Sequence, residues 1–237
     1  EPNFAPFTAK YWQGTYLMGM AAASLSKSKK IGCVGAFAIP ELITSINAFL
    51  LGAQSIDPEI ELSVVWVNSW FDPASEQEAA KALISQGVDV IFSNAQDTPS
   101  VIAVAEDAGV YAWNLNSSMK TYAPSKYLGV VGTHWGPHFK HLVDAHVAGE
   151  FPGENFWLGM EDDVVYTADW NPDIPADIVS QIEERQAAIL DGSFVVFNGP
   201  LVDQSGTERV ADGVAMADGE IISMDWHVAG VTTPLPS

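Results

Sequence analysis

The sequence predicts an α/β fold in which parallel strands form doubly wound sheets with helices on both faces. From Lys30 onward, short runs rich in β-branched residues alternate with longer stretches of helical period, and this alternation is typical of βαβ units. The chain has 237 residues, of which 48% are hydrophobic. This length is enough for one large domain or for two small lobes, each with its own core.

Two pairs of strand and helix open the predicted sheet. Ile31–Phe37 predicts a strand, and Pro40 then stands in the first turn of a helix whose apolar residues recur at helical spacing. Leu62–Asn68 predicts the next strand. The following helix begins at Asp72-Pro73, where Asp72 is suited to cap it, and ends at Gly87.

Three more strands continue the pattern. We expect them at Val88–Ser93, Val110–Asn114 and Leu128–Gly132, with a helix over Pro99–Asp107 between the first two. Repeated crossovers of this kind are right-handed, as a doubly wound sheet requires.

The rest of the chain departs from this rhythm. Gly136–Ala148 and Ala176–Leu190 predict helices, Trp157–Thr167 predicts a strand followed by a loop, and Phe194–Phe197 predicts a further strand. After Gly199 the chain is rich in Gly, Asp and Pro, and we expect an irregular segment with one hairpin.

The charge of the chain argues against one class of partner. Ten Lys and Arg stand against thirty Asp and Glu, a net charge of −20, and such a field repels phosphate backbones, so no nucleic acid is expected as a partner. The acidity fits either solubility in a salty environment or an acidic docking face for a basic partner. Cys33 is the only cysteine, so no intramolecular disulfide is expected.

Neither a membrane span nor a signal sequence is predicted. The longest apolar stretches fall short of the roughly 20 residues that a span needs, and no basic segment followed by an apolar one opens the chain. Glu1–Ala9 has the pattern of a strand or loop that runs into a helix near Tyr11, so we expect the chain to begin inside a longer protein.

Polar and aromatic residues follow several of the predicted strands, where open α/β sheets bind their ligands. The candidates are Asn68, Trp70, Asn94, Asp97, Asn116 and Trp135. Amides and a carboxylate read the hydrogen-bonding edges of a ligand and indoles stack on its face, a combination that suits a heterocycle or a sugar. Turn chemistry also favours Asn and Asp at these positions, and each indole has plain packing as its alternative.

Enzyme and metal motifs are weak. The chain has no G-x-S-x-G, G-x-x-x-x-G-K-[ST] or H-E-x-x-H sequence. Among four nearby histidines, His138 and His141 share a helix face, but His146 points elsewhere. Consecutive carboxylates at Glu161–Asp163 point in different directions and are expected to be solvated. We predict no catalytic residue, no metal site and no cofactor.

Several short stretches occur in an order that resembles one known family. They are Tyr16–Gly19, Lys30–Gly35, Ile39–Glu41, Ile46–Phe49, Val65–Pro73, Glu78–Ile84, Trp135–Pro137 and Ser223–Trp226. Together they resemble the basic-membrane-protein family of ABC-transporter substrate-binding proteins, especially its purine-associated branch. The resemblance runs from about residue 10 to about residue 231.

The resemblance implies a type I periplasmic-binding-protein fold with two lobes and no catalysis. It implies a purine nucleobase or nucleoside held between the lobes, an ABC permease as partner, and a periplasmic or extracytoplasmic location with any lipid anchor outside this chain. Relatives carry further residues before the point that matches Glu1, so the first lobe is expected to be incomplete. That lobe would comprise residues 1–28 and 154–191, and the second lobe residues 29–153 and 192–237.

The resemblance also assigns roles to three residues. Trp70 matches the aromatic residue that stacks on the purine base in relatives. Asn116 stands where relatives carry an acidic residue that reads ribose or base, and the amide lacks that charge. Glu161 stands in a turn where the family often has Lys, which reverses the local charge, and we count it among the candidate ligand-binding residues.

Other classes of function stay open from the sequence. The same fold serves as the ligand-sensing effector domain of transcription regulators, and the residues after the strands suit a sugar or another small polar solute as well as a purine. An enzyme on a doubly wound sheet would need a nucleophile or metal that the motif search does not find.

Overall fold

The computed structural model describes residues 3–236, and its main feature is a six-stranded sheet. The strand order is β3-β2-β4-β5-β6-β8; β8 pairs antiparallel with β6, and all other neighbours are parallel. The strands are β2 (Lys30–Gly35), β3 (Glu61–Trp66), β4 (Val90–Asn94), β5 (Tyr111–Asn116), β6 (Tyr127–Thr133) and β8 (Val165–Ala168). The predicted α/β fold with a parallel sheet is confirmed.

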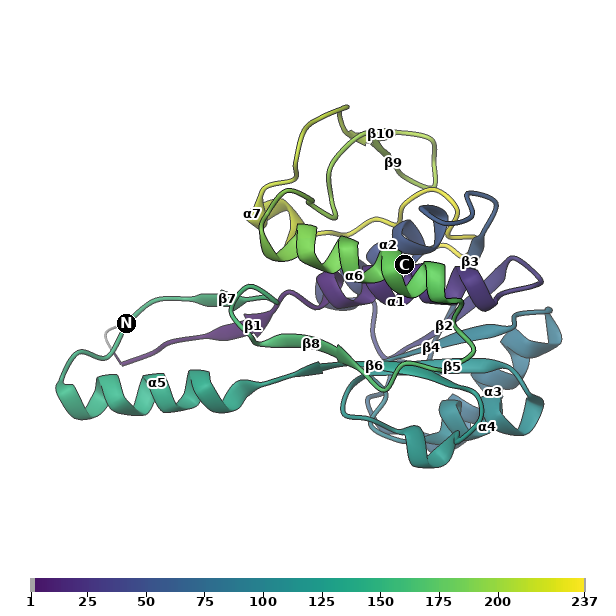
Figure 1. The fold of residues 1–237 in the computed structure, drawn as a ribbon, viewed down its shortest axis with the longest axis horizontal. Helices are drawn as coiled ribbons and strands as arrows, with labels where there is room; N and C mark the ends of the chain where they lie inside the picture. Colours follow the sequence, from purple (N-terminus) through teal and green to yellow (C-terminus); the bar gives the residue numbers. More distant parts are fainter. Residues whose placement is uncertain (1–2, 237) are drawn as a thin grey trace.

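Helices cover both faces of the sheet, each over its own hydrophobic cluster (Figure 1). One face carries α1 (Tyr11–Leu25), α2 (Pro40–Gln54) and α6 (Ala176–Leu190), and the other carries α3 (Pro73–Ser85) and α4 (Ser100–Ala108). Helices α1 and α2 lie very close together. A Cβ added at Gly19 would stand 2.0 Å from the Phe49 carbonyl oxygen, and a Cβ added at Gly52 would stand 1.9 Å from the Tyr16 carbonyl oxygen. Glycine at both positions therefore allows two largely buried helices to pack backbone against backbone.

The ends of the helices form where the sequence predicts them. Pro40 and Pro73 occupy the first turns of α2 and α3, where the missing N–H costs little. The Asp72 side chain caps α3 by accepting a hydrogen bond from the Ser75 backbone N–H at 3.1 Å. Gly109 ends α4 in the left-handed conformation.

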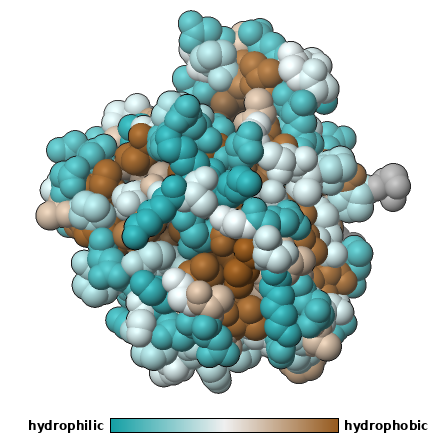
Figure 2. Space-filling model, turned by 90° about the vertical axis from the view of Figure 1, so that its right-hand side faces the viewer, coloured by the Kyte–Doolittle hydropathy of each residue, from teal (hydrophilic) through white to brown (hydrophobic). Residues whose placement is uncertain are grey.

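A second, smaller sheet lies beside the main one. It pairs β1 (Phe7–Ala9) with β7 (Phe156–Leu158) in parallel, and α5 (Trp135–Ala148) extends next to it, away from the main sheet (Figure 1). The Phe7 ring packs against the Trp135 ring with 4.8 Å between centroids. Seen from the end of the molecule opposite to α5, hydrophilic side chains surround smaller apolar patches (Figure 2).

Two local predictions in the second half of the chain are wrong. Residues 194–197 form no strand; Val196 and Phe197 are buried in the core, so their apolar character reflects burial without strand pairing. Trp157–Thr167 does not end as a loop, because β8 follows the turn and pairs with β6.

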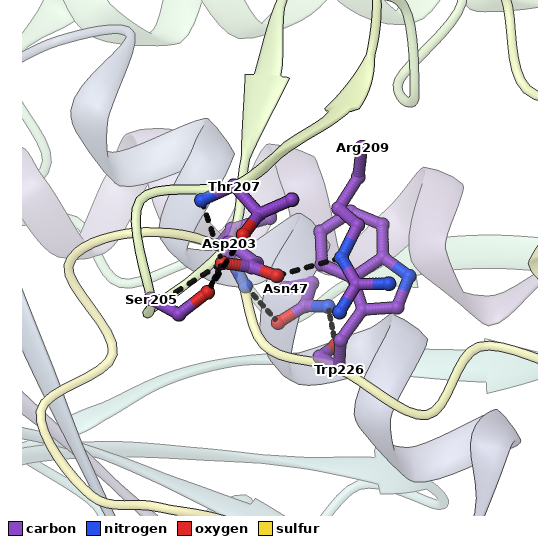
Figure 3. A network of polar contacts seen from close by, with 7 residues as sticks. Asn47, Asp203, Ser205, Thr207, Arg209 and Trp226 are labelled. Carbon is purple, nitrogen blue, oxygen red and sulfur yellow. Dashed lines mark hydrogen bonds and ion pairs between the residues drawn. The ribbon is translucent and has the colours of Figure 1, made fainter.

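The predicted hairpin after Gly199 is confirmed, and a polar network fastens this segment to α2. Strands β9 (Leu201–Val202) and β10 (Glu208–Val210) are antiparallel, and α7 (Asp218–Ile221) follows. Buried Asp203 accepts hydrogen bonds within the hairpin, including one from Arg209 Nε at 2.6 Å, while Asn47 of α2 donates to the Trp226 carbonyl oxygen at 2.8 Å (Figure 3). These bonds hold an irregular segment in one place.

The predicted division into two lobes stays a prediction. Helices α1 and α6, which that division assigns to the first lobe, pack against each other on the α2 face of the main sheet. In residues 3–236 no helix is both long enough and apolar enough to cross a membrane.

Candidate functional site

The backbone adopts the left-handed conformation where three parallel strands of the main sheet end, with strain at Ala95. Asn68, Ala95 and Asn116 have φ angles of 57°, 59° and 75°, at the carboxyl ends of β3, β4 and β5. Residues other than glycine adopt this left-handed region uncommonly, and such outliers gather at binding sites. This edge of the sheet is therefore the first place to examine for a ligand site.

An exposed indole lies at this edge. Trp70 is 42% exposed, and its ring centroid lies 4.9 Å from that of Phe37, which follows β2. The Trp70 carbonyl oxygen accepts a hydrogen bond from the Asp97 backbone N–H at 2.9 Å. The loops after β2, β3 and β4 thus meet, and they bring the backbone of Asp97 against that of Trp70.

A buried carboxylate behind these loops holds them together. The Glu76 side chain is fully buried and accepts hydrogen bonds from the Thr98 hydroxyl and, at 3.1 Å, from the Asp72 backbone N–H. The Gln96 amide donates to the same carboxylate at 3.2 Å and accepts from the Ala36 backbone N–H at 3.1 Å. Glu76 therefore ties together the three loops that present Phe37, Trp70 and Asp97.

Asn116 lies at the end of β5 and is linked to α1. Its side-chain oxygen accepts a hydrogen bond from the Tyr11 hydroxyl at 3.1 Å. Burial, followed by the negative charge of Glu41, raises the pKa of Tyr11 to about 12, so the phenol is a permanent donor near neutral pH. We call Phe37, Trp70, Asp97, Asn116 and Tyr11 the strand-end cluster.

A pocket of ≈ 260 Å³ lies next to Tyr11, between β1, β7, α7 and the start of α2. We call it the side pocket, and its lining residues are Thr8, Ala9, Tyr11, Trp12, Ile39, Pro40, Glu41, Thr44, Trp157, Ile221 and Ile222. Tyr11 belongs both to this pocket and to the strand-end cluster, so the two share one side chain.

The predicted site residues separate into two groups. Trp70, Asp97 and Asn116 lie at the same edge of the sheet, as does the exposed Asn68. Asn94 is buried and donates to the Leu42 carbonyl oxygen at 3.1 Å, which fixes the start of α2.

Trp135 and Glu161 are engaged elsewhere. Trp135 begins α5 and packs on Phe7. Glu161 forms an ion pair with Lys10 at 2.6 Å and accepts from the Gln13 amide at 2.8 Å. Burial alone would raise the pKa of Glu161, but these contacts outweigh it and lower the pKa. Any ligand role for either residue stays a prediction.

Four residues of the site were missed from the sequence, and Phe37, which ends the predicted strand Ile31–Phe37, is one of them. Tyr11 and Glu41 stand in the first turns of α1 and α2, so their side chains meet only through helix packing. Glu76 lies four residues after the N-cap Asp72, where an acidic residue in a first helical turn is ordinary; its burial leaves no signal in the sequence.

Two of the four nearby histidines pack against aromatic rings. His134 stacks on Tyr166, with 4.2 Å between ring centroids, and His138 is buried against Phe7 and Phe156. Over residues 3–236 no three His, Cys, Asp or Glu side chains are grouped as metal ligands.

Comparison with known proteins agrees with the geometry. A purine-binding protein of Brucella abortus is 38% identical over 234 residues, covering 99% of this chain and 66% of its own length. A putative ABC transporter glucose-binding protein of Haloferax volcanii is 32% identical, covering 93% of this chain and 57% of its own. The chain thus spans less than two thirds of the length of these curated relatives.

A solved structure shows the same fold. The ABC transporter solute-binding protein of Aeropyrum pernix superposes with a TM-score of 0.71 at 18% identity, over 80% of this chain and 65% of that one. The sequence profile of the family described as "Bmp: ABC transporter substrate-binding protein PnrA-like" matches residues 2–196. The chain therefore belongs to the Bmp family of PnrA-like ABC transporter substrate-binding proteins.

Proposed function

We propose that this protein is the solute receptor of an ABC import system and that it binds a purine nucleobase or nucleoside at the strand-end cluster. The observation that carries the proposal is the exposed Trp70 indole, held against Phe37 and hydrogen-bonded through its backbone to Asp97. An indole face stacks on a planar heterocycle, and a neighbouring carboxylate and amide read its polar edge. The family and the purine-binding relative support the same reading.

The lobes close on the ligand, because ligand contacts to both lobes shift the equilibrium toward the closed form. The closed receptor then delivers its solute to a membrane permease. It works outside the cytoplasm. Binding and release are its task, and no catalysis is assigned to it.

A sugar is the second candidate ligand. The putative glucose-binding relative favours it, and indoles beside carboxylates and amides also suit a sugar ring. Calorimetry of the full-length protein with adenine, hypoxanthine, their nucleosides and glucose separates the two candidates. Binding of glucose without binding of any purine would reject the purine receptor.

Removal of the Trp70 ring tests the site itself. Trp70→Ala should weaken purine binding by about 1–3 kcal/mol, because the stacked face is lost. Tyr122→Ala is the matched control, since Tyr122 is 53% exposed and lies in the short 3-10 helix η1 (Lys120–Tyr122) near α4. Equal affinities of wild type and Trp70→Ala would remove Trp70 from the site.

A further inference from the structure

Glu41 places a carboxylate without a cationic partner in the wall of the side pocket. None of the ion pairs among residues 3–236 includes it. The hydrogen bond that its carboxylate accepts comes from the Thr8 hydroxyl, at a long 3.3 Å to Oε2. An ionised carboxylate offers about four acceptor positions, so most of its capacity faces the pocket or solvent.

Among the side chains around the side pocket, Thr8 is the one that donates a hydrogen bond to the Glu41 carboxylate. Eight of the eleven lining residues are apolar or aromatic. Glu41 is exposed as a residue, and desolvation of its carboxyl group by the pocket wall raises its pKa. The nearby Tyr11 hydroxyl donates its hydrogen bond to Asn116, so it gives none to the Glu41 carboxylate.

A ligand group that enters the side pocket must therefore donate hydrogen bonds and tolerate flat, apolar walls. The indoles of Trp12 and Trp157 stand 4.8 Å apart between centroids at 69° and supply those walls. A sugar ring would bring several hydroxyls that each need a partner, whereas eight of the eleven side chains that line the pocket are apolar or aromatic. An amino group on an aromatic ring meets both conditions.

We infer that Glu41 is a specificity-determining residue that accepts a hydrogen bond from the exocyclic amino group of the solute, which makes the solute an aminopurine. This inference rests on the proposed function, because it assumes that a purine binds at the strand-end cluster. Tyr11 lines the side pocket and donates to Asn116 of the strand-end cluster, and in the arrangement we infer the amino edge of a base stacked on Trp70 faces Glu41. The Thr8 hydroxyl positions the carboxylate.

Two purines of similar size test the inference by calorimetry of the full-length protein. Adenine carries a 6-amino group, and 6-methylpurine carries a methyl group in its place. Wild type should bind adenine about tenfold or more tightly than 6-methylpurine, because a hydrogen bond to a charged acceptor is worth about one to two factors of ten. Glu41→Ala should reduce this preference to within about twofold, and Glu41→Gln, which keeps one acceptor oxygen, should show an intermediate preference.

A matched control removes the same charge from the other edge of the sheet. Glu61 begins β3 and is exposed, and Glu61→Ala should keep the wild-type preference. Circular dichroism of each variant shows whether it is folded, and the comparison of the two purines in wild type needs no variant.

The outcomes separate the inference from the proposed function. If wild type binds both purines equally, or if Glu41→Ala keeps the full preference for adenine, Glu41 does not read the amino group, although the purine receptor stands. If no purine binds, both fail.

Discussion

Acidification should destabilise the fold through one histidine. His227 is 1% exposed; its Nδ1 lies 3.0 Å from the Asn47 side-chain oxygen, and its ring stacks on Trp66 at 15°. Burial disfavours the charged imidazolium and lowers the pKa of His227 from 6.5 to about 4. The unfolded chain therefore binds a proton at this side chain between about pH 4 and pH 6.5, whereas the folded chain does not.

The sign and size of the effect follow from proton linkage. Because the unfolded state binds more protons in this window, the free energy of unfolding falls as the pH drops below about 6.5, and the loss is complete near pH 4. A pKa difference of about 2.5 pH units, at about 1.36 kcal/mol per pH unit, limits this loss in the free energy of unfolding to about 3 kcal/mol. Between pH 7.5 and pH 5 the loss at this residue should be about 2 kcal/mol.

Urea unfolding of wild type and His227→Gln at several pH values between 7.5 and 5 measures the effect. Titrating carboxylates and the net charge of −20 also affect stability, but they do so in both proteins and cancel in the difference. His146→Gln replaces an exposed histidine and should keep the wild-type pH dependence. If wild type and His227→Gln lose the same stability over this range, His227 is not the buried neutral group described above.

Two further changes test the architecture behind the strand-end cluster. Glu76→Ala should lower the free energy of unfolding by about 2–4 kcal/mol, because the Thr98 hydroxyl, the Asp72 N–H and the Gln96 amide lose a buried acceptor. Urea unfolding measures this loss. The control is Glu78→Ala at an exposed position, and an equal loss of stability in the two variants would contradict the prediction. Ala95→Gly should raise stability by up to about 1 kcal/mol, because glycine adopts φ 59° without strain. Thermal unfolding measures this second change against Ala74→Gly, which should destabilise the first turn of α3; a lower melting temperature for Ala95→Gly would contradict the assigned strain.

Much of the fold follows from patterns along the chain. Ala176–Leu190 forms a helix at the predicted residues, because its isoleucines recur at helical spacing and are buried. Phe194–Phe197 has the same apolar character as a strand, but its residues pack into the core from a loop. An apolar composition predicts that a segment is buried more reliably than it predicts that the segment pairs as a strand.

The sequence predicts only those residues of the candidate site whose position follows from the topology of the sheet. Parallel strands share one edge, so Trp70, Asp97 and Asn116 were expected to gather there. Tyr11 and Glu41 reach the same region because α1 packs closely on α2, and no local pattern encodes that contact.

The polar network between α2 and the segment around β9 and β10 has a kinetic consequence. Asn47 and His227 are 180 positions apart, and closing a flexible loop of that length costs about 4–5 kcal/mol in chain entropy before any contact compensates. Contacts between positions so far apart in the chain slow folding. The helix that carries Glu41 is therefore held by α1 from one end of the sequence and by the hairpin segment from the other, so the position of the carboxylate depends on nearly the whole chain.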